Sequence, residues 1–581
     1  MKRHSKALLG TGVAAVTGLI LAACGGNDDP APSASTTNQN TNAATQAATS
    51  CANLAGTKID KAEIGLPTNG AEVQSATLVA ASAAGNTNGE FCQVKGIIKP
   101  VTTTSNGVPT ENMEFEVNLP TNWNNKAMQL GGGGLNGSLV TGLGAVPLAP
   151  ANYATPLSRG YVTLGSDGGH KGAGGFDGRF MVNDEMLLNY GHQSVKKTHD
   201  VAMALIKKRY SAAPQRFYFV GASQGGHEAL DAAARYPTDY DGVVANYPAY
   251  NVTMLHLGSL NVGKAVYGNG GAGWLNPVKT KLIVDKVYEA CDTVALDGAR
   301  DGIISNVAGC NAAFNIDTVK RNVDAGGLRC PSGGDEGDTC LSDAQIAAVE
   351  QITSPYTPGV SVAGMDTFPR WALLEGSTFV GGSTFGAANA PSANGTGDAL
   401  LYSAGAATTR YAITRNPNLD PLTFDPTAWE SDIKRVASIM DVTNQSLNSF
   451  REKGGKVIMT HGTADDFITP YNSIAYYQRQ QQQYTQSQLD SFLRFYVIPG
   501  LSHGFGNFNA GYDSIGLLEN WVERGQAPGD TVASDKNTGT SGTPANKGSR
   551  PMCVFPKWPK FTGAVDADTS KAANYVCQAP A

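Results

Sequence analysis

The segment Phe217-Tyr218-Phe219-Val220-Gly221-Ala222-Ser223-Gln224-Gly225-Gly226 predicts a buried strand that turns sharply into a helix. Its last part fits Gly-x-Ser-x-Gly, in which the serine occupies a strained turn between a strand and a helix. Only small residues are tolerated two positions before and after that serine, and the turn exposes its hydroxyl at the end of the sheet. We therefore predict that Ser223 is a nucleophile.

Strand-like and helix-like segments alternate on both sides of this motif. Such alternation favours a mostly parallel, doubly wound sheet, and with the serine motif it predicts an α/β-hydrolase fold. The predicted strands are Glu114–Leu119, Lys126–Leu130, Tyr161–Gly165, Phe217–Val220, Gly242–Asn246, Lys456–Thr460 and Phe495–Ile498. The predicted helices are His192–Tyr210, Gly226–Tyr236 and Ser473–Ser491.

The alternation is interrupted in the middle of the chain. After Asn251 the residues Gly, Asn, Ser and Thr become frequent, and four of the nine cysteines cluster before Ser449. We predict a hydrolase domain in two parts, residues 51–250 and 450–581, with a large inserted lid domain at residues 251–449.

A serine hydroxyl needs a histidine base at neutral pH, and the histidine needs an acid that holds its tautomer. In α/β-hydrolases the order along the chain is Ser, acid, His, with each residue at a strand end. Asp465 and His503 follow two successive predicted strands, so we predict Asp465 as the orienting acid and His503 as the base. Asp466 is the alternative acid and His461 the alternative base.

Five further histidines lack this position after a strand. We interpret each of them as structural or solvent-exposed. They are His170, His192, His199, His227 and His256.

An oxyanion hole requires backbone N–H groups aimed at the developing charge. Gln224, the residue after the nucleophile, is expected to supply one. The glycine-rich segment 129–137 follows a predicted strand, and we predict that Gly132 supplies the second. The alternative is a flexible glycine linker; a phosphate-binding loop is disfavoured because no Gly-Lys-Ser/Thr follows.

The N-terminus has the pattern of an export signal. Basic residues 1–6 precede the apolar segment Ala7–Ile20, and Leu21-Ala22-Ala23-Cys24 resembles a bacterial lipobox. We predict that residues 1–23 are a lipoprotein signal peptide and that a lipid on Cys24 anchors the chain to a membrane. A simple secretory signal is the alternative.

Residues 24–50 are rich in Ser, Thr, Asn, Ala and Pro, which predicts a disordered tether. Gly25 follows the lipobox cysteine in place of the Asp associated with inner-membrane retention. We therefore expect an outer-membrane lipoprotein that faces the periplasm or the cell exterior. The 43 basic and 49 acidic residues give a net charge of −6, which argues against nucleic-acid binding.

The other eight cysteines predict disulfides, because an exported chain folds under oxidising conditions. Many pairings are possible, and we favour pairing in sequence order. Free buried cysteines and a zinc site are weaker alternatives, the latter because no Cys-x-x-Cys occurs. The eight are Cys51, Cys92, Cys291, Cys310, Cys330, Cys340, Cys553 and Cys577.

Together these motifs resemble the tannase and feruloyl esterase family of α/β-hydrolases, which includes mono(2-hydroxyethyl) terephthalate hydrolases. The resemblance spans about Cys51 to Cys577 and rests on five segments: residues 131–134, the serine motif extended through 235–242, the loop around Asp465, the loop around His503, and the terminal residues 550–553. It implies a serine esterase that acts on aromatic or hydroxycinnamic esters. We expect the protein to be a monomer.

The resemblance also implies a structural calcium ion in the lid domain. Carboxylate and carbonyl oxygens are the ligands that Ca²⁺ prefers. The implied ligands are the side chains of Asp297 and Asp301 and the carbonyls of Ala299 and Ile303. Asp292 is a further candidate, although it stands two residues farther from Asp297 than the family pattern has it. The alternative is a plain pair of Asp-Gly turns.

One departure from that family concerns the residues beside the nucleophile and the base. Members typically have cysteines before the serine and after the histidine, joined as a disulfide, whereas this chain has Ala222 and Gly504. We therefore expect a more mobile His503 loop. A peptidase or amidase with the same triad, and a non-catalytic surface-binding lipoprotein, are the competing functions.

Overall fold

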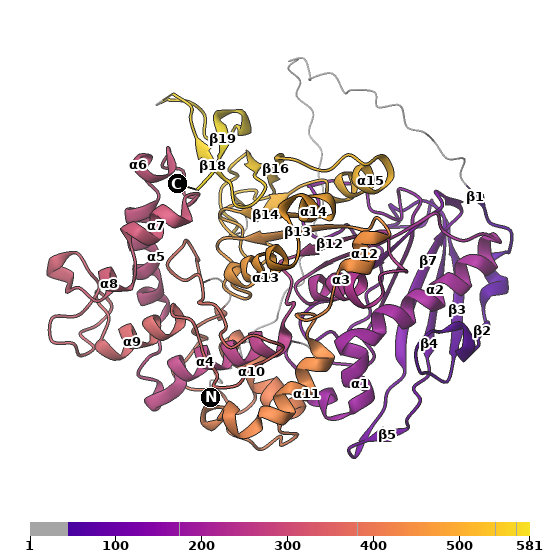
Figure 1. Ribbon diagram of the computed structural model, residues 1–581, viewed down its shortest axis with the longest axis horizontal. Helices are drawn as coiled ribbons and strands as arrows, with labels where there is room; N and C mark the ends of the chain where they lie inside the picture. The colour runs from indigo at the N-terminus through magenta and orange to yellow at the C-terminus, as the bar shows by residue number, and fades with distance from the viewer. Residues whose placement is uncertain (1–44, 173–174, 380–381, 541, 565, 581) are drawn as a thin grey trace, which may run out of the picture. The chain divides into compact units, whose positions relative to one another are not determined.

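The computed structural model describes residues 45–172, 175–379, 382–540, 542–564 and 566–580 (Figure 1). The predicted signal peptide, Cys24 and most of the predicted tether lie outside this range. Thr45–Gln46 (β1) pairs antiparallel with Asn122–Trp123 (β8), so ordered pairing begins a few residues before the predicted end of the tether.

A ten-stranded mixed sheet lies at the centre, in the order β14-β13-β12-β11-β9-β10-β7-β4-β3-β2. The strands from β14 to β10 are parallel, and those from β7 to β2 run antiparallel to their neighbours. Every predicted strand lies in this sheet. The strands are β2 (Lys58–Ile59), β3 (Ala71–Val79), β4 (Phe91–Ile98), β7 (Met113–Pro120), β9 (Lys126–Leu130), β10 (Val162–Ser166), β11 (Arg216–Ala222), β12 (Gly242–Asn246), β13 (Lys456–Gly462) and β14 (Leu493–Ile498).

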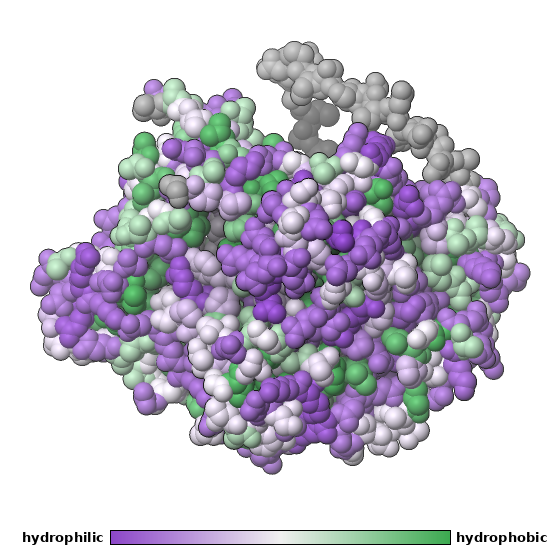
Figure 2. Space-filling model, in the orientation of Figure 1, coloured by the Kyte–Doolittle hydropathy of each residue, from purple (hydrophilic) through white to green (hydrophobic). Residues whose placement is uncertain are grey.

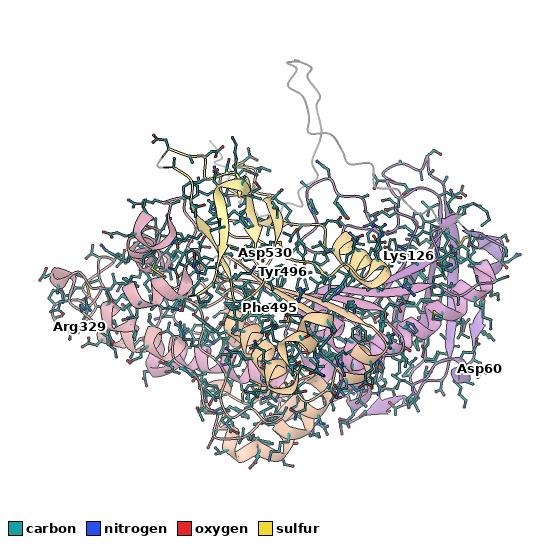
Figure 3. The ribbon with its side chains drawn as sticks, turned by 45° about the horizontal axis from the view of Figure 1, so that its top comes forward. Asp60, Lys126, Arg329, Phe495, Tyr496 and Asp530 are labelled. Carbon is teal, nitrogen blue, oxygen red and sulfur yellow. A yellow bond between two sulfur atoms is a disulfide. The ribbon has the colours of Figure 1, made fainter. Side chains whose placement is uncertain are left out.

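The parallel strands are apolar on both faces, because helices cover both. On β11, Phe217 and Phe219 join the large core that α2 (Ser194–Tyr210) and α3 (Gln224–Arg235) complete. Tyr218 and Val220 face the opposite way, into a second core with α15 (Ser514–Arg524). Figure 3 labels two side chains that divide in the same way, Phe495 and Tyr496 on β14.

One predicted helix is wrong. Residues 473–491 were expected to form a single polar helix, but the structure has α13 (Pro470–Gln483) and α14 (Gln486–Phe492). The break lies at Thr485, whose hydroxyl accepts the Gln488 N–H, while the Gln488 side chain accepts the Thr485 N–H. This capping box starts a new helix.

A long insertion connects the adjacent strands β12 and β13, and the regular elements described within it are helices (Figure 1). It shares the large hydrophobic core with the sheet; Leu260 and Tyr402 of the insertion belong to the same buried cluster as Phe219. Its α-helices are α4 (Val252–Gly271), α5 (Pro277–Cys291), α6 (Val294–Asp297), α7 (Val307–Ala313), α8 (Ile316–Val319), α9 (Asp343–Ile352), α10 (Leu400–Ala407), α11 (Glu430–Met440) and α12 (Asn448–Glu452).

Shorter elements complete the described chain. A three-stranded sheet and a hairpin follow β14. These strands, with the small β5–β6 hairpin and the helix α1, are β5 (Thr104–Ser105), β6 (Val108–Pro109), α1 (Asp184–Leu188), β15 (Ala510–Gly511), β16 (Thr531–Asp535), β17 (Ser549–Met552), β18 (Trp558–Phe561) and β19 (Tyr575–Gln578).

The eight cysteines of the described chain form four disulfides. The predicted pairing in sequence order is confirmed: Cys51–Cys92, Cys291–Cys310, Cys330–Cys340 and Cys553–Cys577. Each bond closes a loop within one part of the chain, and none reaches Ala222 or Gly504.

The surface drawn in Figure 2 is mostly polar, with hydrophobic residues in small separate patches. Within the residues described, no helix has the length and apolar character that crossing a membrane requires.

Candidate active site

The serine motif forms the expected strained turn between β11 and α3. Ser223 has φ 60° and ψ −120°, a backbone conformation that L-residues rarely adopt. A Cβ at Gly221 would lie 2.1 Å from the Gly225 carbonyl oxygen, and one at Gly225 would lie 2.8 Å from the Gly132 carbonyl oxygen. Both glycines are therefore required by the close approach of backbone.

Asp465 and His503 meet at the ends of β13 and β14. His503 Nδ1 lies 2.9 Å from Asp465 Oδ2. The other oxygen of this buried carboxylate accepts the N–H groups of Phe467 and Ile468, at 2.9 and 3.0 Å. Burial alone would raise the pKa of Asp465, but the His503 imidazole and a hydrogen bond from His461 hold it well below its usual range. The acid is therefore fixed and ionised.

The two rival residues occupy other positions. Asp466 is hydrogen-bonded to the Ser383 hydroxyl, and its Oδ1 lies 3.4 Å from Ser502 Oγ. Burial raises the pKa of Asp466 to about 7. His461 is fully buried, with its nitrogens 2.7 Å from Ser473 Oγ and 2.7 Å from the Ile468 carbonyl oxygen. Neither geometry suits an orienting acid or a mobile base.

Ser223 and His503 line one cavity with a volume of about 60 Å³, between the end of the sheet and the insertion. Within the described chain no hydrogen bond joins the serine hydroxyl to the imidazole. Such contacts are often long without substrate and shorten in the complex. Helices α4 and α10 supply most of the opposite wall, including Leu255 and Leu401.

Gly132, which we predicted for the oxyanion hole, has hydrogen-bond partners of its own in the structure. Its N–H donates to the buried Glu228 carboxylate at 3.0 Å, and its carbonyl accepts the Gly225 N–H at 3.0 Å. Asn136 Nδ2 donates to the other Glu228 oxygen at 2.6 Å. The Gly132 N–H is therefore already paired, and the glycine segment is a fixed loop rather than a flexible linker.

Gln224 remains in position to contribute to an oxyanion hole. It begins α3 directly after the nucleophile and lines the cavity, and its N–H has no hydrogen-bond acceptor in the described part of the chain. Gly134 lines the same cavity.

Two aromatic side chains contact the His503 ring. Phe467 stacks on it with the ring centroids 5.1 Å apart and an interplanar angle of 19°. Tyr247, directly after β12, approaches with its centroid at 4.5 Å. Van der Waals contact and the hydrogen bond to Asp465 therefore position the ring. No disulfide can do so here, because the residues at the two cysteine positions are Ala222 and Gly504.

The predicted calcium loop is partly buried. Asp292 accepts the N–H groups of Asp301 and Gly302, and Asp297 accepts those of Ser305 and Asn306. Asp301 Oδ2 lies 3.0 Å from Arg550 Nη2. Among the described residues, no choice of one carboxylate oxygen from each of Asp292, Asp297 and Asp301 brings all three oxygens within 4.8 Å of one another.

One residue of the cavity was missed from the sequence. His256, interpreted as structural or solvent-exposed, lines the cavity from α4. Its spacing from Val252 and Ser259 places these residues on one helix face, but nothing local shows what that face meets.

The family model for tannase and feruloyl esterase matches residues 92–578. The chain belongs to the tannase and feruloyl esterase family. An uncharacterized esterase of Agrobacterium fabrum is 34% identical over 542 residues, covering 91% of this chain and 92% of that protein. The mono(2-hydroxyethyl) terephthalate hydrolase of Piscinibacter sakaiensis is 28% identical over 539 residues, covering 84% and 85%.

Feruloyl esterase B from Aspergillus oryzae has the same fold as this family member. Its crystal structure aligns with a TM-score of 0.68 at 24% identity, covering 89% of this chain and 98% of that one. With the family match, these relatives identify the chain as a carboxylic ester hydrolase with an α/β-hydrolase fold.

Proposed function

We propose that this tannase and feruloyl esterase family member hydrolyses aromatic or hydroxycinnamic esters through an acyl-enzyme on Ser223. The observation that carries the proposal is the strained serine and an Asp465-bound His503 on the wall of one cavity. Two relatives are named for feruloyl and terephthalate esters, which supports an aromatic acyl group.

The first half-reaction follows from these positions. His503 Nε2 takes the proton from Ser223 Oγ as that oxygen attacks the ester carbonyl carbon. The C–O bond to the alcohol then breaks, and the imidazolium returns the proton to the leaving oxygen. Asp465 stabilises the imidazolium through Nδ1 and stays ionised. Water, activated in turn by His503, releases the acid.

The oxyanion formed during attack needs donors that are not already paired. We place one at the Gln224 N–H. Because the Gly132 N–H is donated to Glu228, we place the other on the next residues of the same loop, Gly133 and Gly134. A Cβ at Gly133 would meet nothing within 4 Å, and Gly134 lines the cavity that contains Ser223. Removing one such donor typically costs about a hundredfold or more in rate.

The residues of the calcium loop fit a hard cation in their chemistry. Asp292 and Asp297 are buried, accept only backbone N–H groups, and form no ion pair among the described residues. We propose that these carboxylates, with Asp301 and the carbonyls of Ala299 and Ile303, hold Ca²⁺. The ion would neutralise charge in the insertion and stabilise it.

The disulfides support export to an oxidising compartment. We propose that the chain is a lipoprotein anchored through Cys24. Palmitate labelling in a bacterial host that is lost in Cys24→Ser would support the anchor; equal labelling of the variant would contradict it.

An ester panel tests the proposed function. Purified protein is assayed on methyl ferulate, methyl gallate, terephthalate monoester and short alkyl esters, with p-nitroanilides for amidase activity. The expected result is turnover of methyl ferulate and methyl gallate at least tenfold faster than that of the alkyl esters, with no anilide turnover. Faster anilide than ester hydrolysis would contradict the proposal.

A further inference from the structure

Helix α4 presents one face to the cavity that contains Ser223. Val252, Leu255, His256 and Ser259 all line it, at the spacing that places residues on one side of a helix. Val252 and Leu255 are expected of any apolar pocket, and the Ser259 hydroxyl donates to the Leu255 carbonyl of its own helix at 2.8 Å. The imidazole is the exception, because a buried polar ring is kept only where it finds hydrogen-bond partners.

Only one nitrogen of His256 is paired. Nδ1 lies 2.6 Å from the Thr408 hydroxyl oxygen, at the end of α10. Nε2 has no hydrogen-bond partner in the described part of the chain. It is not enclosed by protein atoms either, because it retains some accessible surface. Since the residue is only 6% exposed and lines the cavity, Nε2 is the atom that reaches this space.

The His256–Thr408 pair can act as donor or acceptor toward a ligand. A hydroxyl can donate to Nδ1, which leaves a proton on Nε2, or accept from Nδ1–H, which leaves Nε2 as an acceptor. The paired hydroxyl therefore lets Nε2 match either role of a ligand hydroxyl.

The cavity carries little charge. The described residues that line it include no Lys, Arg, Asp or Glu, and His503 is the only other imidazole. Burial lowers the pKa of His256 to about 4, so this ring is neutral at pH 7. Burying an anionic group here would be costly, because it would lose its water without gaining a cation as partner. Burying a neutral hydroxyl that finds a hydrogen-bond partner avoids this cost.

We infer that His256 determines specificity by hydrogen-bonding, through Nε2, a neutral hydroxyl on the substrate group bound beneath α4. This rests on the proposed esterase function. The hydrogen bond to His256 selects hydroxyaryl esters over unsubstituted aryl esters. The cavity, which lacks a cation, excludes esters whose ring carries a carboxylate.

Three methyl cinnamates that differ only at the para position test the inference at pH 7. They carry hydrogen, hydroxyl or carboxylate. For the unaltered protein we expect kcat/KM to be about tenfold higher for hydroxyl than for hydrogen, and lowest for carboxylate. Equal values for hydrogen and hydroxyl, or a preference for carboxylate, would overturn it.

Two variants separate recognition from folding. In His256→Asn the amide can reach Thr408 but not the cavity, so the hydroxyl-to-hydrogen ratio should fall to about one while the unsubstituted ester is still hydrolysed. In His256→Gln the longer amide reaches the cavity and should retain most of the preference. A ratio unchanged in His256→Asn, or an equal loss on both esters in both variants, would contradict the inference.

p-Nitrophenyl acetate distinguishes a failure of the proposed esterase function from a failure of the role inferred for His256. It is small and has no ring hydroxyl on its acyl group, so the turnover that is lost in Ser223→Ala reports Ser223 chemistry alone. If the unaltered protein turns over neither this ester nor any of the methyl cinnamates, the proposed function itself is contradicted; Ser223-dependent turnover without hydroxyl preference would contradict only the role of His256.

Discussion

The outer parts of the molecule and the catalytic end of the sheet are held together in different ways. Disulfides close loops at the N-terminal strands, at two places in the insertion and at the C-terminal hairpin. At the catalytic end, His503 is held by Asp465 and by contact with Phe467 and Tyr247. Covalent links thus stabilise the outer parts of the molecule, while the reacting groups depend on packing and hydrogen bonds.

The largest effect on kcat is expected from loss of the hydrogen bond between Asp465 and His503 at the catalytic end. Asp465→Asn removes the charge that orients His503 and stabilises its protonated form, and should lower kcat by about ten-thousandfold. Asp466→Asn is the matched control, because Asp466 bonds Ser383 rather than His503. Steady-state kinetics on one ester measure both. A larger loss in Asp466→Asn would reverse our assignment of the acid.

The next effect concerns a covalent link in the insertion. Replacing both Cys291 and Cys310 by Ser opens the loop that their disulfide closes, across a sequence separation of 19. This should lower the free energy of unfolding by about 3 kcal/mol. Urea denaturation measures this. Because neither cysteine lines the cavity that contains Ser223, kcat at low temperature should change less than twofold. A large loss of kcat in folded protein would show that the two regions are coupled.

Phe467→Ala tests whether packing replaces a covalent link at the catalytic end. Loss of the ring stacked on His503 should lower kcat about tenfold and speed hydrogen exchange at residues 501–506. In the unaltered protein we already expect this loop to exchange faster than β13. Exchange as slow as in β13, both before and after substitution, would contradict the account.

Removal of calcium should have the smallest effect. EGTA is expected to lower the unfolding midpoint by a few degrees through loss of a ligand of the folded state, and added Ca²⁺ should restore it. Asp297→Asn should make the midpoint insensitive to both treatments. A midpoint that does not respond to EGTA in the unaltered protein would argue against the site.

The predicted strands succeeded because apolar runs and strand-end residues report local structure. Asp465 and His503 follow their strands directly, so chain order sufficed to bring them together. The partner of the Gly132 N–H could not be predicted, because Glu228 is 96 positions away in the sequence. Similarly, His256 was missed because only the packing of α4 against α10 places it in the cavity. Local patterns give no information on such contacts.

Covalent labelling of Ser223 tests the central claim most directly. The protein is incubated with a fluorophosphonate, which reacts with activated serines, and the adduct is located by peptide mass spectrometry. We expect one adduct, on the peptide that contains Ser223, none in Ser223→Ala, and loss of esterase activity in proportion to labelling. Folded protein that hydrolyses esters while Ser223 stays unlabelled would contradict the account.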